Sequence, residues 1–171
     1  MHKIILILYR TSIMNPIENA IWTIGYNGPI IAFFLAIWKL WYLRPDFYWF
    51  IIGFAGNEMV NEFLKMWIKE PRPKDLVKFI DHNNLKGAHE YGMPSGHAQE
   101  ISFIIVFVYA VFRHIEWLYM TIPLWILTCF QRWTMRRHTV KQLVTGSIVG
   151  GTLGAFTYWI MRSLHLFTNL I

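Results

Sequence analysis

The most constraining feature of this chain is a series of long apolar segments joined by short polar turns. A helix needs about 20 mostly apolar residues to cross the roughly 30 Å hydrocarbon core of a bilayer. Five segments reach or approach this length, at about residues 21–43, 47–68, 97–112, 117–133 and 140–166. The sequence therefore predicts an all-α fold, a multi-pass transmembrane helical bundle of about five spans.

The composition agrees with a surface that faces lipid. Of the 171 residues 55% are hydrophobic and only 15% are charged, whereas soluble domains carry about 25% charged residues. The net charge of +6 comes from basic residues in short loops beside apolar runs. This placement favours loops that face anionic membrane lipids over a nucleic-acid partner. The single cysteine, Cys129, has no intrachain partner and gives no information about the compartment.

The predicted domain organisation is simple. Residues 1–20 hold a short apolar run that is followed by no A-x-A-like cleavage site, so we expect an uncleaved interfacial N-terminal segment. Residues 21–171 then form one membrane domain. Gly28-Pro29 predicts a kink in the first span, or its true start. Residues 69–95 form the only long loop between the spans.

Alternation of the five spans fixes the side of the membrane on which each loop lies. The ends of the second and fourth spans must share one face with the starts of the third and fifth. The unusual polar side chains of the sequence all fall at these four points. They are Lys65, Arg72, Ser95, His97, Arg132 and His138. Such a cluster of ionisable groups in a membrane protein predicts a functional site.

Each of these residues taken alone has an ordinary explanation. Lys65 lies in an apolar helix, where a charge costs roughly 2.5–3.5 kcal/mol at mid-membrane and less near the edge, but it could reach the interface by snorkelling. Arg72 alone would be a solvated loop residue. Ser95 and Gly96 precede the third span, whose free N–H groups can bind an anion. A lone Ser-Gly-His would be no more than a helix cap with a satisfied histidine, here His97.

The stretch between the fourth and fifth spans carries three arginines and a histidine. Arg132 can bind two phosphate oxygens at once, which lysine cannot. His138 and Gln142 are spaced i, i+4, so we expect them to share one helix face. Three glycines continue this face into the bundle with the spacing of closely packed transmembrane helices; they are Gly146, Gly150 and Gly154. The alternative is a basic interfacial anchor with one incidental histidine.

Taken together, two histidines, three cationic donors and a serine at a helix start match a phosphoryl-transfer site. One histidine attacks phosphorus, a second protonates the leaving oxygen, and the cations stabilise the phosphoryl oxygens. The acidic residues do not have the spacing of metal ligands. We therefore expect a metal-independent reaction with no cofactor.

These residues also form three motifs in order, and through them the chain resembles the type 2 phosphatidic acid phosphatase superfamily. The family signature is K-x6-RP, PSGH and SR-x5-H-x3-D. The chain has Lys65 six residues before Arg72-Pro73, a complete Pro94-Ser95-Gly96-His97, and Arg132 five residues before His138. The resemblance implies a hydrolase whose helical core is that of a lipid phosphatase.

Two positions depart from the signature. Gln131 stands in place of serine, and Gln142 stands in place of the aspartate that orients the nucleophile. Glutamine can accept a hydrogen bond but brings no charge, and the comparable loss in a serine-protease triad costs about 10⁴ in kcat. An inactive lipid-binding protein that kept the fold is therefore one interpretation.

A narrower resemblance accounts for Gln142, because glutamine is usual at this position in the dolichyl diphosphatase branch. The residues shared with that branch are Asn57-Glu58, Asn61, Lys65, Glu70-Pro71-Arg72-Pro73, Tyr91-Gly92-Met93-Pro94-Ser95, His97, Gln99, His138-Thr139 and Gln142. This resemblance implies hydrolysis of a polyisoprenyl diphosphate, dolichyl diphosphate, to dolichyl phosphate and orthophosphate. It implies an active site that faces the lumen of the endoplasmic reticulum, where the product serves protein glycosylation.

The resemblance also implies a role for each residue. His138 is the nucleophile that forms a phosphohistidine, His97 protonates the departing lipid phosphate and later activates water, and Gln142 orients His138. The phosphate-binding residues would be Lys65, Arg72, Ser95, Gly96 and Arg132. On these roles, Gln142→Asp should preserve or raise activity.

Two questions stay open at this point. The motifs recognise phosphate and not the lipid tail, so a broader phosphatase acting on phosphatidic or lysophosphatidic acid is an alternative. The loops also carry more positive charge on the active face, which by the positive-inside rule would place that face in the cytoplasm and not in the lumen. The active-face residues counted are Lys3, Arg10, Lys69, Lys74, Lys78, Lys86, Arg136, Arg137 and Lys141, against Lys39, Arg44, Arg113 and Arg162 opposite.

Overall fold

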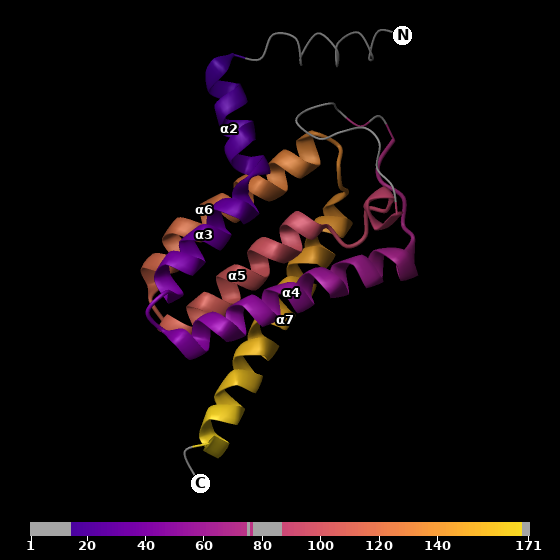
Figure 1. Ribbon diagram of the computed structural model, residues 1–171. Helices are drawn as coiled ribbons and strands as arrows, with labels where there is room; N and C mark the ends of the chain where they lie inside the picture. The colour runs from indigo at the N-terminus through magenta and orange to yellow at the C-terminus, as the bar shows by residue number, and fades with distance from the viewer. Residues whose placement is uncertain (1–14, 75, 77–86, 169–171) are drawn as a thin grey trace, which may run out of the picture.

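The computed structural model describes residues 15–74, 76 and 87–168, so most of the N-terminal segment predicted at 1–20 lies outside it. Helices account for nearly all of this part, and no β-strand occurs within it (Figure 1). The elements are α2 (Pro16–Tyr26), α3 (Gly28–Leu40), α4 (Arg44–Ile68), the short 3-10 helix η1 (Gly87–Glu90), α5 (Gly96–Phe112), α6 (Ile115–Thr134) and α7 (Val140–Thr168). The predicted all-α class is confirmed.

The first predicted span is bent, as the Gly28-Pro29 pair predicted. Helices α2 and α3 meet at Asn27 with an angle of 59° between them. Proline at the start of α3 fixes the backbone for a new helix and cannot continue the hydrogen bonding of the preceding one. The bend gives α2 a direction of its own at the end of the bundle (Figure 1).

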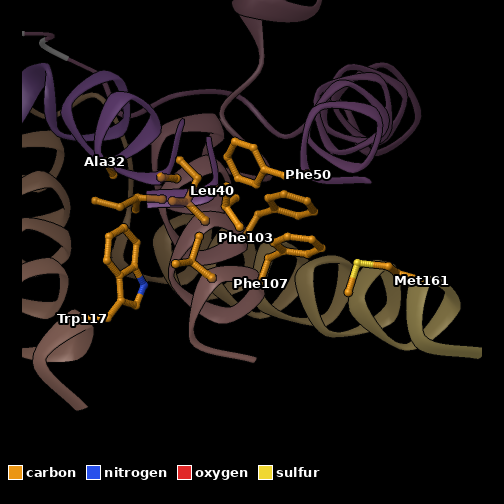
Figure 2. Close-up of a cluster of buried hydrophobic side chains, with 11 residues drawn as sticks. Ala32, Leu40, Phe50, Phe103, Phe107, Trp117 and Met161 are labelled. Atoms are coloured by element: carbon orange, nitrogen blue, oxygen red, sulfur yellow. The ribbon is translucent and has the colours of Figure 1, made fainter. Parts of the chain in front are cut away.

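Helix α5 is the centre of the bundle and packs against α3, α4, α6 and α7. The core around it is aromatic: the ring of Phe50 lies 6.2 Å from that of Phe103 and 5.7 Å from that of Phe107 (Figure 2). Leu40 and Trp117 close the cluster from α3 and α6. Lipid tails are as apolar as these side chains, so close packing holds such helices together more than burial from water does.

The glycine stripe of α7 lies directly against α5, which confirms that this face points into the bundle. A Cβ on any of these glycines would collide with the α5 backbone or the turn before it. The pairs are Gly146 with Ser95, Gly150 with Gln99, and Gly154 with Phe103. Glycine is required here because the two backbones are too close for a side chain.

The outer faces of the bundle expose large apolar side chains. They include Trp38, Phe63, Trp67, Ile126 and Trp159, which are 53–74% exposed. Apolar surface on this scale marks contact with lipid or another apolar partner and not with water.

By length and composition, one helix of the described part can cross a membrane, Val140–Leu164, or two if bent α2–α3 counts as one. Two features explain why α4 and α5 are not among these helices. Helix α4 carries polar residues such as Asn57 and Glu58, and α5 has only 17 residues, about 26 Å at 1.5 Å each. The number of spans therefore stays a prediction.

Candidate active site

The four helix ends expected to share one face do meet (Figure 1). His138 lies there in the turn between α6 and α7 and is only 3% exposed. The positive charges of Arg72, Arg132, His97 and Lys65 all act on its imidazole. The structure therefore gathers the predicted cations and both predicted histidines around one point.

Hydrogen bonds define the tautomer of His138. Its Nδ1 lies 2.9 Å from the carbonyl oxygen of Gly92, and its Nε2 lies 3.2 Å from Nη1 of Arg72. A carbonyl can only accept and a guanidinium can only donate. Nδ1–H therefore donates to Gly92, and Nε2 keeps its lone pair. This is the form that a nucleophilic Nε2 requires.

The same surroundings keep the imidazole neutral. Burial lowers the pKa of His138 well below its usual range, and the adjacent charges of Arg72 and Arg132 lower it further. Near neutral pH, Nε2 is therefore unprotonated.

The expectation that His138 and Gln142 share a helix face is wrong, because α7 begins at Val140 and His138 precedes it. The physical reason is a capping box. The Thr139 N–H donates to Oε1 of Gln142 (3.1 Å), and the Gln142 N–H donates to Oγ1 of Thr139 (3.2 Å). This reciprocal pair starts a helix at the residue after Thr139. His138 is left in the turn, where its ring can face the site.

Gln142 also does not make the direct bond to His138 that its predicted orienting role implied. Its Nε2 donates to Oε1 of Glu70 (2.9 Å) and to the carbonyl oxygen of Pro71 (3.0 Å). The Gly92 carbonyl takes the place of the expected orienting group. A Cβ on Gly92 would lie 2.6 Å from the Gln142 amide, so only glycine allows this approach.

The start of α5 has the form of an anion site. Ser95 occupies the cap position before Gly96, and its Oγ is buried with no hydrogen-bond partner in the described part of the chain. Nζ of Lys65 lies 3.5 Å from where a Gly96 Cβ would be. A buried hydroxyl without a partner, beside a lysine and a helix N-terminus, fits a phosphoryl group.

Arg72 is held by the loop around it. Its Nε donates to the carbonyl oxygen of His89 (3.0 Å), and its Nη1 donates to that of Arg137 (3.1 Å) as well as to His138. The guanidinium is thus fixed beside the His138 imidazole, where its planar donors could bind the oxygens of an anion.

A tyrosine outside the three sequence motifs, Tyr26, lies among the site residues. The ring of Tyr26, at the end of α2, is 5.5 Å from that of His97, and the guanidinium of Arg132 lies 5.6 Å from its centroid. Arg132 is 4% exposed, and the neighbouring Gln131, at the position where serine is usual, packs against Gly25. No sequence pattern singles out Tyr26, because aromatic residues near the ends of membrane spans are common.

A buried amide network joins α4 to α5 next to Lys65 and His97. Nδ2 of Asn61 donates to Oε1 of Gln99 (2.8 Å), and Nε2 of Gln99 donates to the backbone and side-chain oxygens of Asn57 (2.8 and 3.0 Å). Fully bonded buried amides fix the relative positions of two helices. In the described residues no group of three His, Cys, Asp or Glu is placed to hold a metal ion.

Comparison with known proteins gives consistent relatives. The chain is 32% identical over 133 residues to lipid phosphate phosphatase epsilon 2, chloroplastic, of Arabidopsis thaliana, which covers 71% of this chain and 42% of that protein. It is 27% identical over 134 residues to dolichyldiphosphatase of Saccharomyces cerevisiae. This match covers 66% of this chain and 55% of the yeast protein. The chain thus spans about half the length of these curated relatives.

A structural comparison and a family model point to the same group of proteins as these relatives. The structure resembles the crystal structure of a transmembrane PAP2 type phosphatidylglycerolphosphate phosphatase from Bacillus subtilis, with a TM-score of 0.61 and 18% identity over 93% of this chain and 82% of that one. The helices of the chain are thus arranged as in that transmembrane protein. Residues 46–165 match the model of the PAP2 superfamily, and the chain belongs to that family.

Proposed function

We propose that this protein hydrolyses a polyisoprenyl diphosphate to the monophosphate and orthophosphate, with no metal or other cofactor. The observation that carries the proposal is the buried His138, whose unprotonated Nε2 accepts a hydrogen bond from Arg72. The choice of a diphosphate lipid rests on Gln142 and on the dolichyldiphosphatases among the relatives, of which that of Dictyostelium discoideum is 28% identical over 137 residues. In this proposal residues 21–171 act as one domain.

The first step forms a phosphohistidine. The Nε2 lone pair of His138 attacks the terminal phosphorus, a N–P bond forms, and the P–O bond to the lipid phosphate breaks. His97 gives its proton to the departing oxygen. Arg72 moves its hydrogen bond from Nε2 to a phosphoryl oxygen as the substrate enters.

The second step releases orthophosphate. His97, now neutral, takes a proton from water, and the resulting hydroxide attacks phosphorus while the N–P bond breaks. His138 returns to its neutral form. In both steps the charge on the phosphoryl oxygens is stabilised by fixed donors; these are Lys65, Arg72, Ser95, the N–H of Gly96, and Arg132.

Two other functions have some support. The relatives named lipid phosphate phosphatase favour a broader enzyme that acts on phosphatidic or lysophosphatidic acid. An inactive lipid-binding protein was suggested by the loss of the aspartate at Gln142. The hydrogen bond from His138 to Gly92 argues against this second possibility, since it supplies the orientation that the aspartate would have given.

The test is phosphate release by the purified protein in detergent. Dolichyl diphosphate should be hydrolysed faster than phosphatidic acid, and His138→Ala should abolish both turnover and the covalent phosphoenzyme. Faster hydrolysis of the monoester phosphatidic acid would favour the broader phosphatase. Wild-type turnover by His138→Ala would contradict the mechanism.

We further propose that the active face lies in the lumen of the endoplasmic reticulum, despite the excess of basic residues in its loops. Some of this charge can attract an anionic lipid headgroup. Glycosylation acceptor sites introduced into the loop at 69–95 should be modified in microsomes if this orientation is correct. Modification of sites in the turn at 113–115 instead would place the active face in the cytoplasm.

A further inference from the structure

Glu70 is an acidic residue next to the site to which the proposed mechanism assigns no role. It follows Lys69, which ends α4 in the left-handed conformation (φ 52°). Its side chain accepts from Nε2 of Gln142 (2.9 Å) and from Nζ of Lys141 (3.1 Å). Its backbone carbonyl accepts from the N–H of Gly92 (2.8 Å). One residue thus connects the end of α4 to the start of α7 and to the loop before α5.

The Gln142 amide can hold only one orientation in these contacts. The Thr139 N–H requires an acceptor, so Oε1 must face it. The two hydrogens of Nε2 are then used by Glu70 and by the carbonyl of Pro71. A rotated amide would turn its oxygen toward a carboxylate and a carbonyl, and three groups would lose their partners. Gln142 is fully buried, so water does not replace them.

These contacts lead to the nucleophile through Gly92. Its N–H is bound by Glu70, its carbonyl accepts from His138, and its Cα lies against the Gln142 amide. A shift of the amide or of Glu70 therefore moves the carbonyl that orients His138.

We infer, given the proposed function, that Glu70 is a positioning residue: it holds Gln142 and Gly92 so that the Gly92 carbonyl orients His138. It touches no substrate in this role. What it must supply is an acceptor at the distance of a glutamate side chain. Its negative charge is not the essential property, because the group that orients His138 is a neutral carbonyl.

Two substitutions of Glu70 distinguish the effect of its side-chain length from that of its negative charge. Glu70→Asp keeps the charge but is one methylene too short to accept from Gln142, whereas Glu70→Gln loses the charge but keeps an acceptor at the right distance. We expect Glu70→Asp to lose about 10- to 100-fold in kcat, as catalytic groups do when misplaced by about 1 Å. Its KM should change less than about threefold, because the phosphate-binding residues are untouched. The kcat of Glu70→Gln should be at least about tenfold higher than that of Glu70→Asp.

Lys141→Met is the matched control. Lys141 also bonds Glu70, but its side chain is 73% exposed, and surface ion pairs contribute little. This variant should have the kcat of the wild type. If Glu70→Asp does not fold, as judged by size-exclusion profile, Glu70→Leu against Glu70→Gln makes the same comparison, since leucine fills the space without accepting.

The outcomes are distinct. Wild-type kcat in Glu70→Asp, or an equal loss in Glu70→Gln, would overturn the positioning role. His138→Ala measured alongside reports on the proposed function separately. If that variant hydrolyses dolichyl diphosphate at the wild-type rate, the proposed function fails, whatever the Glu70 variants do.

Discussion

At the scale of single residues, His138, the proposed nucleophile, is oriented by a neutral carbonyl and not by a carboxylate. The Gly92 carbonyl fixes which nitrogen of His138 carries the proton but adds no negative charge to stabilise an imidazolium. Buried among cations, His138 therefore has little tendency to take up a second proton. Three predictions follow from this arrangement: one concerns the titration of His138, and two concern substitutions of Gly92 and Gln142.

The first prediction concerns pH. The pKa of His138 is lowered by burial and by Arg72, so the neutral form should persist as the pH falls through about 6.5, the ordinary value for histidine. Because the folded pKa is the depressed one, the stability linked to this group is present above pH of about 6.5 and is lost as pH falls toward the folded pKa. Nitrogen-15 NMR of histidine-labelled protein should show that His138 keeps the neutral Nδ1–H tautomer as the pH falls through about 6.5. A resonance that is absent in His138→Ala and titrates at 6.5 or above would contradict the prediction.

The second prediction is that Gly92→Ala impairs catalysis. The new Cβ would lie 2.6 Å from the Gln142 amide, so either this buried, hydrogen-bonded amide or the Gly92 backbone that orients His138 must move. We expect kcat to fall by about 100-fold and the free energy of unfolding by about 1–3 kcal/mol. Gly56→Ala is the control, since no atom lies within 4 Å of its Cβ position. Equal kcat values in the two variants would show that Gly92 tolerates a side chain.

The third prediction reverses the sequence-based expectation for Gln142→Asp. Aspartate cannot donate to Pro71, and it would place one carboxylate against that of Glu70. We therefore expect this variant to lose activity by about 10- to 100-fold, with about 1–3 kcal/mol of stability lost through the unpaired carbonyl. Phosphate release and thermal unfolding would measure the two effects. Activity at or above the wild-type level would restore the direct orienting role.

At the scale of helices, the contact between α5 and α7 decides whether the two halves of the site meet. Ser95 lies at the start of α5, and His138 lies just before α7. The glycine stripe sets the distance between these helices along the buried half of α7.

The fourth prediction is therefore that Gly150→Ala destabilises the protein and reduces its activity together. Its Cβ would strike the backbone of Gln99, which cannot rotate away as a side chain can, so the helices must separate. We expect the free energy of unfolding to fall by about 1–3 kcal/mol or more, and the activity to fall with it. Gly151→Ala, one residue away, meets only a Val106 methyl at 3.6 Å and should behave as wild type. Equal melting temperatures for the two variants would mean that the stripe does not set the helix spacing.

The helices themselves could be predicted from sequence, since their apolar lengths and Pro/Gly breaks are local signals. The predicted start of the fifth span at residue 140 agrees with α7, which begins at Val140. The exception is the expected pairing of His138 with Gln142 on one helix face, because the Thr139–Gln142 capping box leaves His138 in the turn before α7.

At the scale of the whole molecule, the alternation of the predicted spans places distant parts of the sequence on one face. Lys65, His97 and Arg132 are far apart in sequence, yet they had to share a face. What could not be predicted were contacts through backbone groups, such as Gly92 to His138 and Glu70 to Gly92. Backbone amides and carbonyls occur at every position, so sequence does not show which of them will be used.

The bond between Arg72 and His138 has a consequence for selectivity. Nε2 of His138 accepts from Arg72, the same cation that binds the substrate in the proposed function. A neutral molecule in the site is no stronger hydrogen-bond acceptor for the guanidinium than the imidazole is. Arg72 therefore stays bonded to Nε2, and the lone pair is not available. An anion of the right shape competes for the arginine and, in taking it, uncovers the nitrogen that will attack. Under the proposed function, the negative charge of the substrate thus exposes the attacking nitrogen, whereas water leaves it bonded to Arg72.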